Sequence, residues 1–173
     1  MIIQSDLKRF NTLFFVKASL IILYLALTFP IPFIAISGLK RLSIIFLILG
    51  FCLITNLTND FVQTSDNNVS YHTSLIANLV GKKSWQLSWE DIKSIKSIGT
   101  SQGSKVHYFV TDEGKNFLIP QRINKLEEFI LVISTKTNLN TKNISYISPL
   151  WTYKLLTFIS LSMLLGEISF FAF

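Results

Sequence analysis

Hydrophobic residues are concentrated near the two ends of the chain, and the pattern between them is of a different kind. One apolar run covers roughly residues 13–36, a second covers residues 42–57, and a third runs over about residues 150–173. A helix of about 20 mainly apolar residues is long enough to cross the hydrocarbon core of a bilayer. The pattern predicts a transmembrane hairpin within an N-terminal segment, residues 1–57, and a third transmembrane helix in residues 149–173.

Residues 58–148 have the pattern of a water-soluble antiparallel sheet, in which apolar and polar side chains alternate and polar turns separate the strands. In the segment SWQLSW the side chains of Trp85, Leu87 and Trp89 fall on one face, and a short turn follows at residues 90–91. The segment DEG later separates two runs in the way that a tight hairpin turn does. We expect about six strands, at residues 61–65, 69–75, 84–89, about 95 onward, 105–111 and 115–120.

The end of this module predicts an amphipathic helix at about residues 124–136. We expect Asn124 to cap the helix, with Glu127 as the reciprocal partner of a capping box. Apolar residues recur at helical spacing and form one face that can dock on a bent sheet. They are Leu126, Phe129, Ile130 and Ile133. The expected fold class is therefore a membrane protein of the α+β type. It has a two-helix N-terminal transmembrane hairpin, an antiparallel sheet with a C-terminal helix, and a third transmembrane helix.

The order of these elements resembles the pleckstrin-homology-like (PH-like) superfold, in particular its bacterial membrane-anchored versions. The resemblance covers roughly residues 60–136 and is carried by three segments in succession, SWEDIKSI, VHYFVTDEG and FLIPQRINKLEEFI. In such proteins a W-x-D-I-x-x-I stretch commonly precedes two strands, an I-P step and a terminal helix. The resemblance implies that residues 58–148 form a PH-like recognition module.

The chain also has a narrower likeness to the photosystem I assembly factor family of thylakoid membranes. In that family two N-terminal spans precede a succession similar to DIKSI, HYFV and LIP in this chain. The chain departs from the family because it adds a third span and lacks the family's Gly-Tyr-rich start and its glycine-basic turn. This likeness implies a role in the assembly of a membrane complex.

The composition agrees with a membrane protein. Half of the residues are hydrophobic, the mean hydropathy is +0.47, and only 15% of residues are charged, against about 25% in soluble domains. The formal net charge is +6, but residues 58–149 hold ten Lys or Arg against eight Asp or Glu, so most of the excess flanks the apolar runs. Without a basic stripe or a known binding motif, nucleic acid is not an expected partner.

Lysine and arginine residues near the apolar runs indicate the orientation of the chain, because short cytoplasmic segments are enriched in them. The cations at Lys8, Arg9 and Lys17 favour a cytoplasmic N-terminus, whereas Lys40 and Arg41 in the hairpin loop oppose it. The C-terminal run has no cation near its end. We therefore expect a multi-pass protein of the plasma membrane or thylakoid membrane, with the central module on the cytoplasmic side.

The sequence carries no recognisable catalytic constellation. Cys52 is the single cysteine, and His72 and His107 lie far apart without the spacing of metal ligands. The motifs of phosphate-binding loops, dinucleotide-binding turns and nucleophile elbows are absent. We expect no enzyme activity, no cofactor, no metal ion and no small-molecule substrate.

The candidate contact residues of the module are basic. Lys82, Lys83 and Trp85 follow one turn, where two cations beside an aromatic ring could touch anionic headgroups or a protein partner. Lys93 and Lys96 could extend this patch if they face the same way. The alternative is a solvated turn with Trp85 in the hydrophobic core.

Glu167 is the acidic residue of the third apolar run. Ionisable groups within a membrane are costly to bury and often functional, so Glu167 is a candidate for an intramembrane contact with a partner helix. The alternative is that Glu167 lies at the far membrane interface and has no specific function there.

Three functions are compatible with this pattern. The first is a non-catalytic integral membrane protein whose module binds a membrane-protein partner, as an assembly or scaffolding factor of a membrane complex that could be photosynthetic. The second is a module that senses anionic lipids of the bilayer. The third is an accessory subunit of a transporter or intramembrane enzyme.

Overall fold

The computed structural model describes residues 7–101 and 103–172, which divide into two compact units. A helical unit contains residues 14–58 and 149–172, and a mixed α+β module contains residues 7–13 and 59–148. Each unit has its own interior, so each is described by itself.

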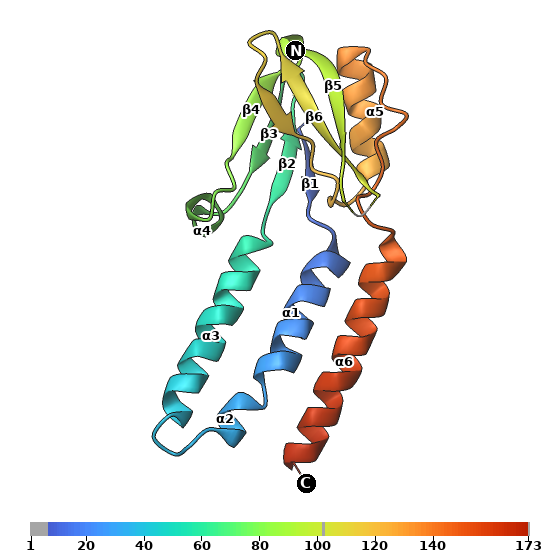
Figure 1. The fold of residues 1–173 in the computed structure, drawn as a ribbon. Coiled ribbons are helices and arrows are strands. Elements are labelled where there is room, and N and C mark those ends of the chain that lie inside the picture. The colour runs from blue at the N-terminus through green and yellow to red at the C-terminus, as the bar shows by residue number, and fades with distance from the viewer. Residues whose placement is uncertain (1–6, 102, 173) are drawn as a thin grey trace, which may run out of the picture. The chain divides into compact units, whose positions relative to one another are not determined.

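The helical unit contains three helices that are long and apolar enough to cross a membrane (Figure 1). They are α1 (Phe14–Thr28), which continues through the short α2 (Ile31–Ile34), α3 (Lys40–Leu57) and α6 (Leu150–Ala172). Their bounds confirm the three apolar helices that the sequence predicts. Pro30 ends α1 and begins α2, because proline cannot donate to the preceding turn of a helix.

Helix α1 contacts both α3 and α6. Small residues are buried in α1 and α6, namely Ser19, Ala26 and Ser160, as expected where helices approach closely without a hydrophobic driving force between them. The rings of Phe33 and Phe171 stack at 4.7 Å between their centroids. Most other large apolar side chains of these helices are exposed, and α3 has no buried residue. Such a surface is apolar all round, which suits lipid rather than water.

The module contains two antiparallel sheets. The four strands of the first sheet are hydrogen-bonded in the order β1-β2-β3-β4, and those of the second in the order β5-β6-β7. The strand bounds are β1 Lys8–Asn11, β2 Phe61–Thr64, β3 Asn68–His72, β4 Trp85–Ser88, β5 Ile92–Gly99, β6 Lys105–Thr111 and β7 Asn116–Leu118. The molecule is therefore of the α+β type, with antiparallel sheets and apolar helices.

Strand β1 is not among the strands that the sequence predicts. We assign its residues to the N-terminal segment from sequence, but Asn11 pairs with Phe61 and Lys8 with Thr64. Phe10 is buried, and its ring lies 5.3 Å from that of Phe129 in the core. Helices α1 to α3 are therefore inserted between two neighbouring strands of one sheet.

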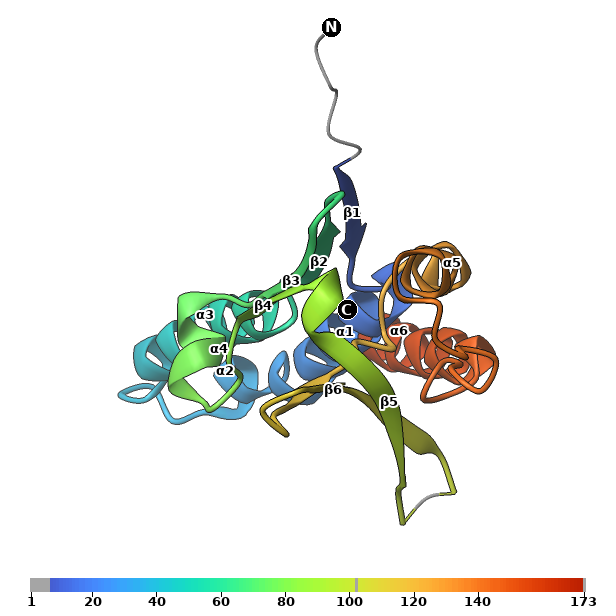
Figure 2. The same cartoon turned by 90° about the horizontal axis from the view of Figure 1, so that it is seen from above.

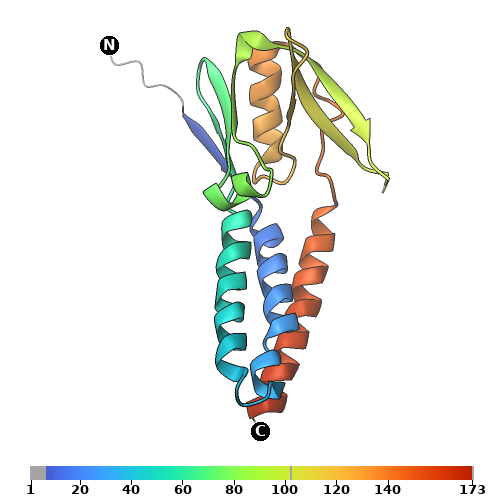
Figure 3. The same ribbon diagram turned by 60° about the vertical axis from the view of Figure 1, so that its left-hand side comes forward.

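A single helix fills the space between the two sheets (Figure 3). This helix, α5 (Leu126–Thr137), buries Leu126, Phe129 and Ile133, as its sequence predicts. The three side chains join the core, which includes Val62, Val69, Leu87 and Phe109 from the two sheets and Ile119 directly after β7. Seen from above, β5 and β6 form a long hairpin that extends away from the first sheet (Figure 2).

Three local predictions differ from the structure. The strand expected at residues 69–75 ends at His72, because Ser74 caps a short helix, α4 (Leu75–Leu79). The strand expected from about Ile95 begins at Ile92, directly after a 3-10 turn at Trp89–Asp91. The capping box of α5 is not formed, since Lys125 is the N-cap in a left-handed conformation without a side-chain cap.

Candidate functional site

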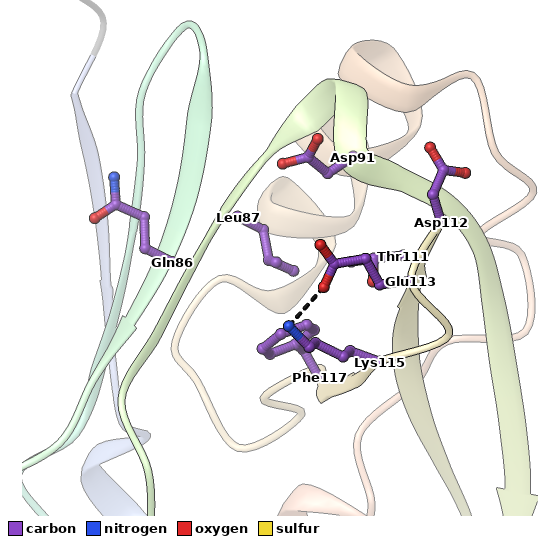
Figure 4. Close-up of a pocket in the computed structure, with 8 residues that line it drawn as sticks. All are labelled: Gln86, Leu87, Asp91, Thr111, Asp112, Glu113, Lys115 and Phe117. Carbon is purple, nitrogen blue, oxygen red and sulfur yellow. Dashed lines mark ion pairs between the residues drawn. The ribbon is translucent and has the colours of Figure 1, made fainter.

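The module has an open cleft of about 460 Å³ between β4 and the β6–β7 hairpin (Figure 4). Gln86 and Leu87 line it from the first sheet, and Thr111 and Phe117 line it from the second. Asp91, from the 3-10 turn, lies at its upper end in the view of Figure 4. The two sheets therefore leave a concave surface where they do not pair with each other.

The edge of β4 at this cleft has unpaired backbone groups. The amide of Trp89 donates to the carbonyl of Asn67 over 3.0 Å, so these two residues form a hydrogen-bonded pair. In the same register, Val69 and Leu87 form the next hydrogen-bonded pair. Bonded and non-bonded pairs alternate along an antiparallel ladder. The backbone N–H and C=O of Gln86 therefore point away from β3.

Strand β7 offers a second open edge by the same reasoning. The amide of Ile119 donates to the carbonyl of His107 over 2.8 Å, and Phe117 pairs with Phe109 in the same register. The backbone groups of Asn116 therefore point away from β6. Open edges of this kind are templates onto which an extended peptide can add as a further strand.

The rim of the cleft is charged, and its floor is apolar. Glu113 and Lys115 form an ion pair at 2.5 Å (Figure 4). Their mutual hydrogen bond lowers the pKa of Glu113 and raises the pKa of Lys115. Asp112 pairs with Lys93 at 3.2 Å, but both side chains are exposed, so the pair is weak. With Asp91, the rim holds three carboxylates against two ammonium groups, above the side chains of Leu87 and Phe117.

The lysine turn that the sequence indicates follows helix α4. Lys82 Nζ lies 2.5 Å from Asp60 Oδ2, and the hydroxyl of Tyr71 donates to the same carboxylate oxygen over 3.0 Å. Burial, and next the charge of Asp60, raise the pKa of Tyr71 far above its usual range. Lys83 is exposed.

Trp85 lies in the core rather than at the rim of the turn. Its ring contacts those of Phe109 and Phe117, each at 5.9 Å, and that of Tyr71 at 6.0 Å. Its Nε1 is buried without a hydrogen-bond partner among the described residues. Trp85 therefore bridges the two sheets. This position agrees with the alternative that places Trp85 in the hydrophobic core.

Lys93 and Lys96 lie on the second sheet. Lys93 stands at an irregularity of the β5–β6 register and pairs with Asp112. Lys96 is exposed opposite Tyr108, on the face away from buried His107 and Phe109. These two lysines belong to β5, whereas Lys82 is paired with Asp60 beside the first sheet. The four lysines therefore do not share one strand or one ion-pair network.

The two histidines have different environments. His107 is buried on β6, where its Nδ1 lies 2.8 Å from the hydroxyl of Ser97. Burial, with a smaller effect of Lys105, lowers the pKa of His107. His72 lies on β3, with its ring stacked on that of Phe61 at 4.7 Å. Residues 7–101 and 103–172 contain no cluster of three His, Cys, Asp or Glu residues that could hold a metal ion.

Glu167 belongs to the helical unit and is half-buried on α6. It shares a helix face with Ser160, Leu164 and Phe171, at spacings of four and three residues. Its Oε2 atom is buried and has no hydrogen-bond partner within the described part of the chain. This oxygen of the carboxyl group therefore faces the interior of the helical unit.

Sequence reasoning does not find the cleft, because its lining residues come from two separate stretches of the chain, residues 86–91 and 111–117. Gln86 and Thr111 carry no distinctive motif, and their proximity follows from the packing of two sheets on α5. It also does not find the exposed face of α4. The segment LIANLVGKK could have indicated one, since a short apolar run precedes a glycine and two lysines.

Comparison with known proteins yields a distant homologue. No family model matches the chain. The uncharacterized protein slr0269 of the cyanobacterium Synechocystis sp. is 28% identical over 148 residues, which cover 82% of this chain and 74% of that protein. The aligned length exceeds that of the module alone, so the similarity includes part of the apolar helices.

Proposed function

We propose that this chain is an integral membrane protein whose PH-like module binds an extended segment of a membrane-protein partner, as an assembly or scaffolding factor. The single observation that supports this function best is the cleft between β4 and β7, where two sheet edges with unpaired backbone groups border one concave surface.

Insertion of the three apolar helices in a bilayer is supported by their length and their exposed apolar surface. The longest, α6, has 23 residues and begins with Trp151 and Tyr153, side chains that prefer the headgroup region. The distribution of cations favours a cytoplasmic module. The cyanobacterial homologue is consistent with a plasma membrane or a thylakoid membrane, and the PH-like order is supported by the two antiparallel sheets and the C-terminal helix.

Membrane anchorage suits a binding function. An anchored module is confined to a thin layer at the bilayer, so its effective concentration for membrane-embedded partners is high. A strand added to β4 or β7 would gain backbone hydrogen bonds, and the apolar floor at Leu87 and Phe117 would select its side chains. The carboxylates of the rim favour a partner segment that carries Lys or Arg.

Site-specific photo-crosslinking in membranes of the native host tests this proposal. A photo-reactive amino acid at Gln86 is expected to give one discrete adduct with a membrane protein. The matched control is the same amino acid at Leu131, which is exposed on α5 and is expected to give no such adduct. Equal adducts at both positions, or none at Gln86, would contradict the proposal.

A proline at the open edge provides an independent measurement. Gln86→Pro removes an N–H that points away from β3, so the ladder between β3 and β4 is retained while strand addition is blocked. Gln86→Thr retains the N–H and serves as the control. We expect the partner to co-purify with the Gln86→Thr variant and to be lost with Gln86→Pro, at similar thermal stability of the two proteins.

A role of Glu167 in an accessory subunit is a second candidate function. Its support is the half-buried carboxyl group with an unpartnered oxygen on α6. Glu167→Gln keeps the shape of the side chain and removes its charge. If this variant rescues every phenotype of a deletion strain, Glu167 has no function as an ionisable group.

A further inference from the structure

Helix α4 exposes an apolar face that its own module does not cover. Leu75, Leu79 and Val80 are 83%, 88% and 70% exposed, the highest values for large apolar residues in the module. Three such side chains within six residues form a patch, which we call the α4 face. Contiguous exposed apolar groups of this kind mark interaction sites.

The α4 face is held in place by local structure. The side chain of Ser74 accepts from the amide of Ala77, which caps the helix at its start. At its end Gly81 has a φ of +95°, and the amide of Lys82 donates to the carbonyl of Ala77 over 3.0 Å. Ala77 is fully buried, so the opposite side of the helix is anchored to the module. The exposed face is therefore a fixed surface.

Helix α4 lies at the edge of the module from which the chain continues into the apolar helices. It follows β3, whose last residue, His72, pairs with Phe61 at the start of β2. Asp60, three residues after the end of α3, accepts from the amide of Thr12 near the start of α1 and pairs with Lys82 after α4. Figure 1 shows α4 beyond the ends of β3 and β4.

The third connection leaves the same part of the module. The amide of Leu13, next to α1, donates to the carbonyl of Arg122, and the neighbouring Gln121 donates to the carbonyl of Ser145. Ser145 is five residues before the start of α6. All three chain segments that lead to apolar helices are thus joined by hydrogen bonds along one edge.

The charge beside the α4 face is positive. Lys82 and Lys83 follow it directly, and residues 67–89 contain no Asp or Glu. Asp60 is the acidic group that contacts Lys82, and it leaves the exposed Lys83 uncompensated by an ion pair among the described residues. An apolar face flanked by lysine is the composition of segments that lie in the interface of anionic membranes.

We propose that α4 inserts Leu75, Leu79 and Val80 into the headgroup and acyl boundary of an anionic bilayer, with Lys83 on the headgroups. This inference rests on the proposed membrane embedding of the chain but not on the partner cleft. A protein partner or a second copy would need no anionic lipid, so their binding is distinguishable from this one. The contact fixes the orientation of the module and of its cleft relative to the membrane surface.

Fluorescence in vesicles tests the proposal with the full chain. An environment-sensitive fluorophore is attached to the variant Leu79→Cys in a Cys52→Ser background, and the vesicles contain phosphatidylcholine, phosphatidylglycerol and lipids with a quencher on the acyl chain. We expect a shift of the emission to shorter wavelength and quenching at position 79. The same fluorophore on Leu131→Cys, an exposed residue of α5, is expected to remain in water.

A fluorophore on native Cys52 distinguishes membrane embedding of the chain from the α4 contact, because Cys52 is exposed on α3. Quenching at position 52 without quenching at position 79 would overturn the α4 contact and leave membrane embedding intact. Absence of quenching at both positions would overturn both. Shielding of position 79 without quenching by lipid would indicate a protein contact and overturn the proposal. Quenching that is unchanged in vesicles without phosphatidylglycerol would overturn the requirement for an anionic bilayer.

Lys83→Glu measures the role of charge, with Lys96→Glu on β5 as the matched control. We expect Lys83→Glu to lower the ratio of docked to undocked α4 by about fivefold or more in anionic vesicles. Lys96→Glu is expected to leave that ratio unchanged. Equal effects of the two substitutions would contradict a specific contact at the turn after α4.

Discussion

Asp60 and Lys82 form an ion pair in which the carboxylate is nearly buried and the ammonium group is half-exposed. Asp60 also accepts from Tyr71, so one carboxylate oxygen links the residue before β2, strand β3 and the turn after α4. We expect Asp60→Asn to lower the free energy of unfolding of the module by about 1–2 kcal/mol, because a buried hydrogen bond to a charged group is weakened. Asp66→Asn is the control, since the Asp66–Lys136 pair is exposed and surface pairs contribute about 0–1 kcal/mol. Thermal unfolding in detergent measures both; equal effects would contradict the role of Asp60.

The membership of β1 in the module predicts a large effect of Phe10. The side chain is 3% exposed and contacts Phe129, and truncation of a buried phenylalanine costs about 3–5 kcal/mol. We expect Phe10→Ala to make residues 59–148 sensitive to limited proteolysis, whereas Leu7→Ala, at a side chain that is 57% exposed, leaves them resistant. Resistance of the Phe10→Ala protein would show that the sheet is stable without β1.

His107 predicts a dependence of stability on pH. Burial lowers its pKa in the folded protein, so the unfolded chain binds the proton more tightly and acid favours unfolding. The free energy of unfolding should fall as the pH decreases from the unfolded pKa of about 6.5 to the lower pKa of the folded state, by at most about 1.4 kcal/mol per pH unit. His107→Gln should remove this part of the dependence. Unfolding of both proteins at pH 7.5 and 5.5 measures it, and an unchanged slope in the variant would contradict the assignment to His107.

The contact of Tyr24 with α3 predicts a requirement for glycine at position 50. The hydroxyl of Tyr24 donates to the carbonyl of Leu47 over 3.0 Å, and a Cβ at Gly50 would lie 2.6 Å from its Cζ. Gly50→Ala must displace the ring, at a cost of about 1–3 kcal/mol. Gly166→Ala on α6, where no atom lies within 4 Å of the added carbon, should be neutral or slightly stabilising. The thermal stability of the two variants in detergent compares them.

The elements that the sequence predicts well are those whose signal is local. The DEG turn lies between β6 and β7, and the period of Leu126, Phe129 and Ile133 places one face of α5 in the core. The three apolar helices follow from length and composition alone. Such signals depend only on residues close in sequence, so they can be recognised without knowledge of the tertiary structure.

The elements that the sequence does not predict depend on distant residues. Strand β1 has four residues, KRFN, with no alternation, and its partner β2 lies beyond the three helices α1 to α3. The ion pair of Lys82 with Asp60 and the position of Trp85 between the sheets are likewise tertiary contacts. The cleft exists only because both sheets pack on α5, so its residues carry no signal in the sequence.

The separation of β1 from β2 has a consequence for biosynthesis. Strand β1 leaves the ribosome first, but Phe61, the partner of Asn11, is made fifty positions later, after α1 to α3. Closing so long a loop is costly while the intervening chain is unfolded, and a formed hairpin shortens the gap. Completion of the first sheet is therefore favoured once α1 to α3 have formed, which couples maturation of the module to folding of the helices made before β2.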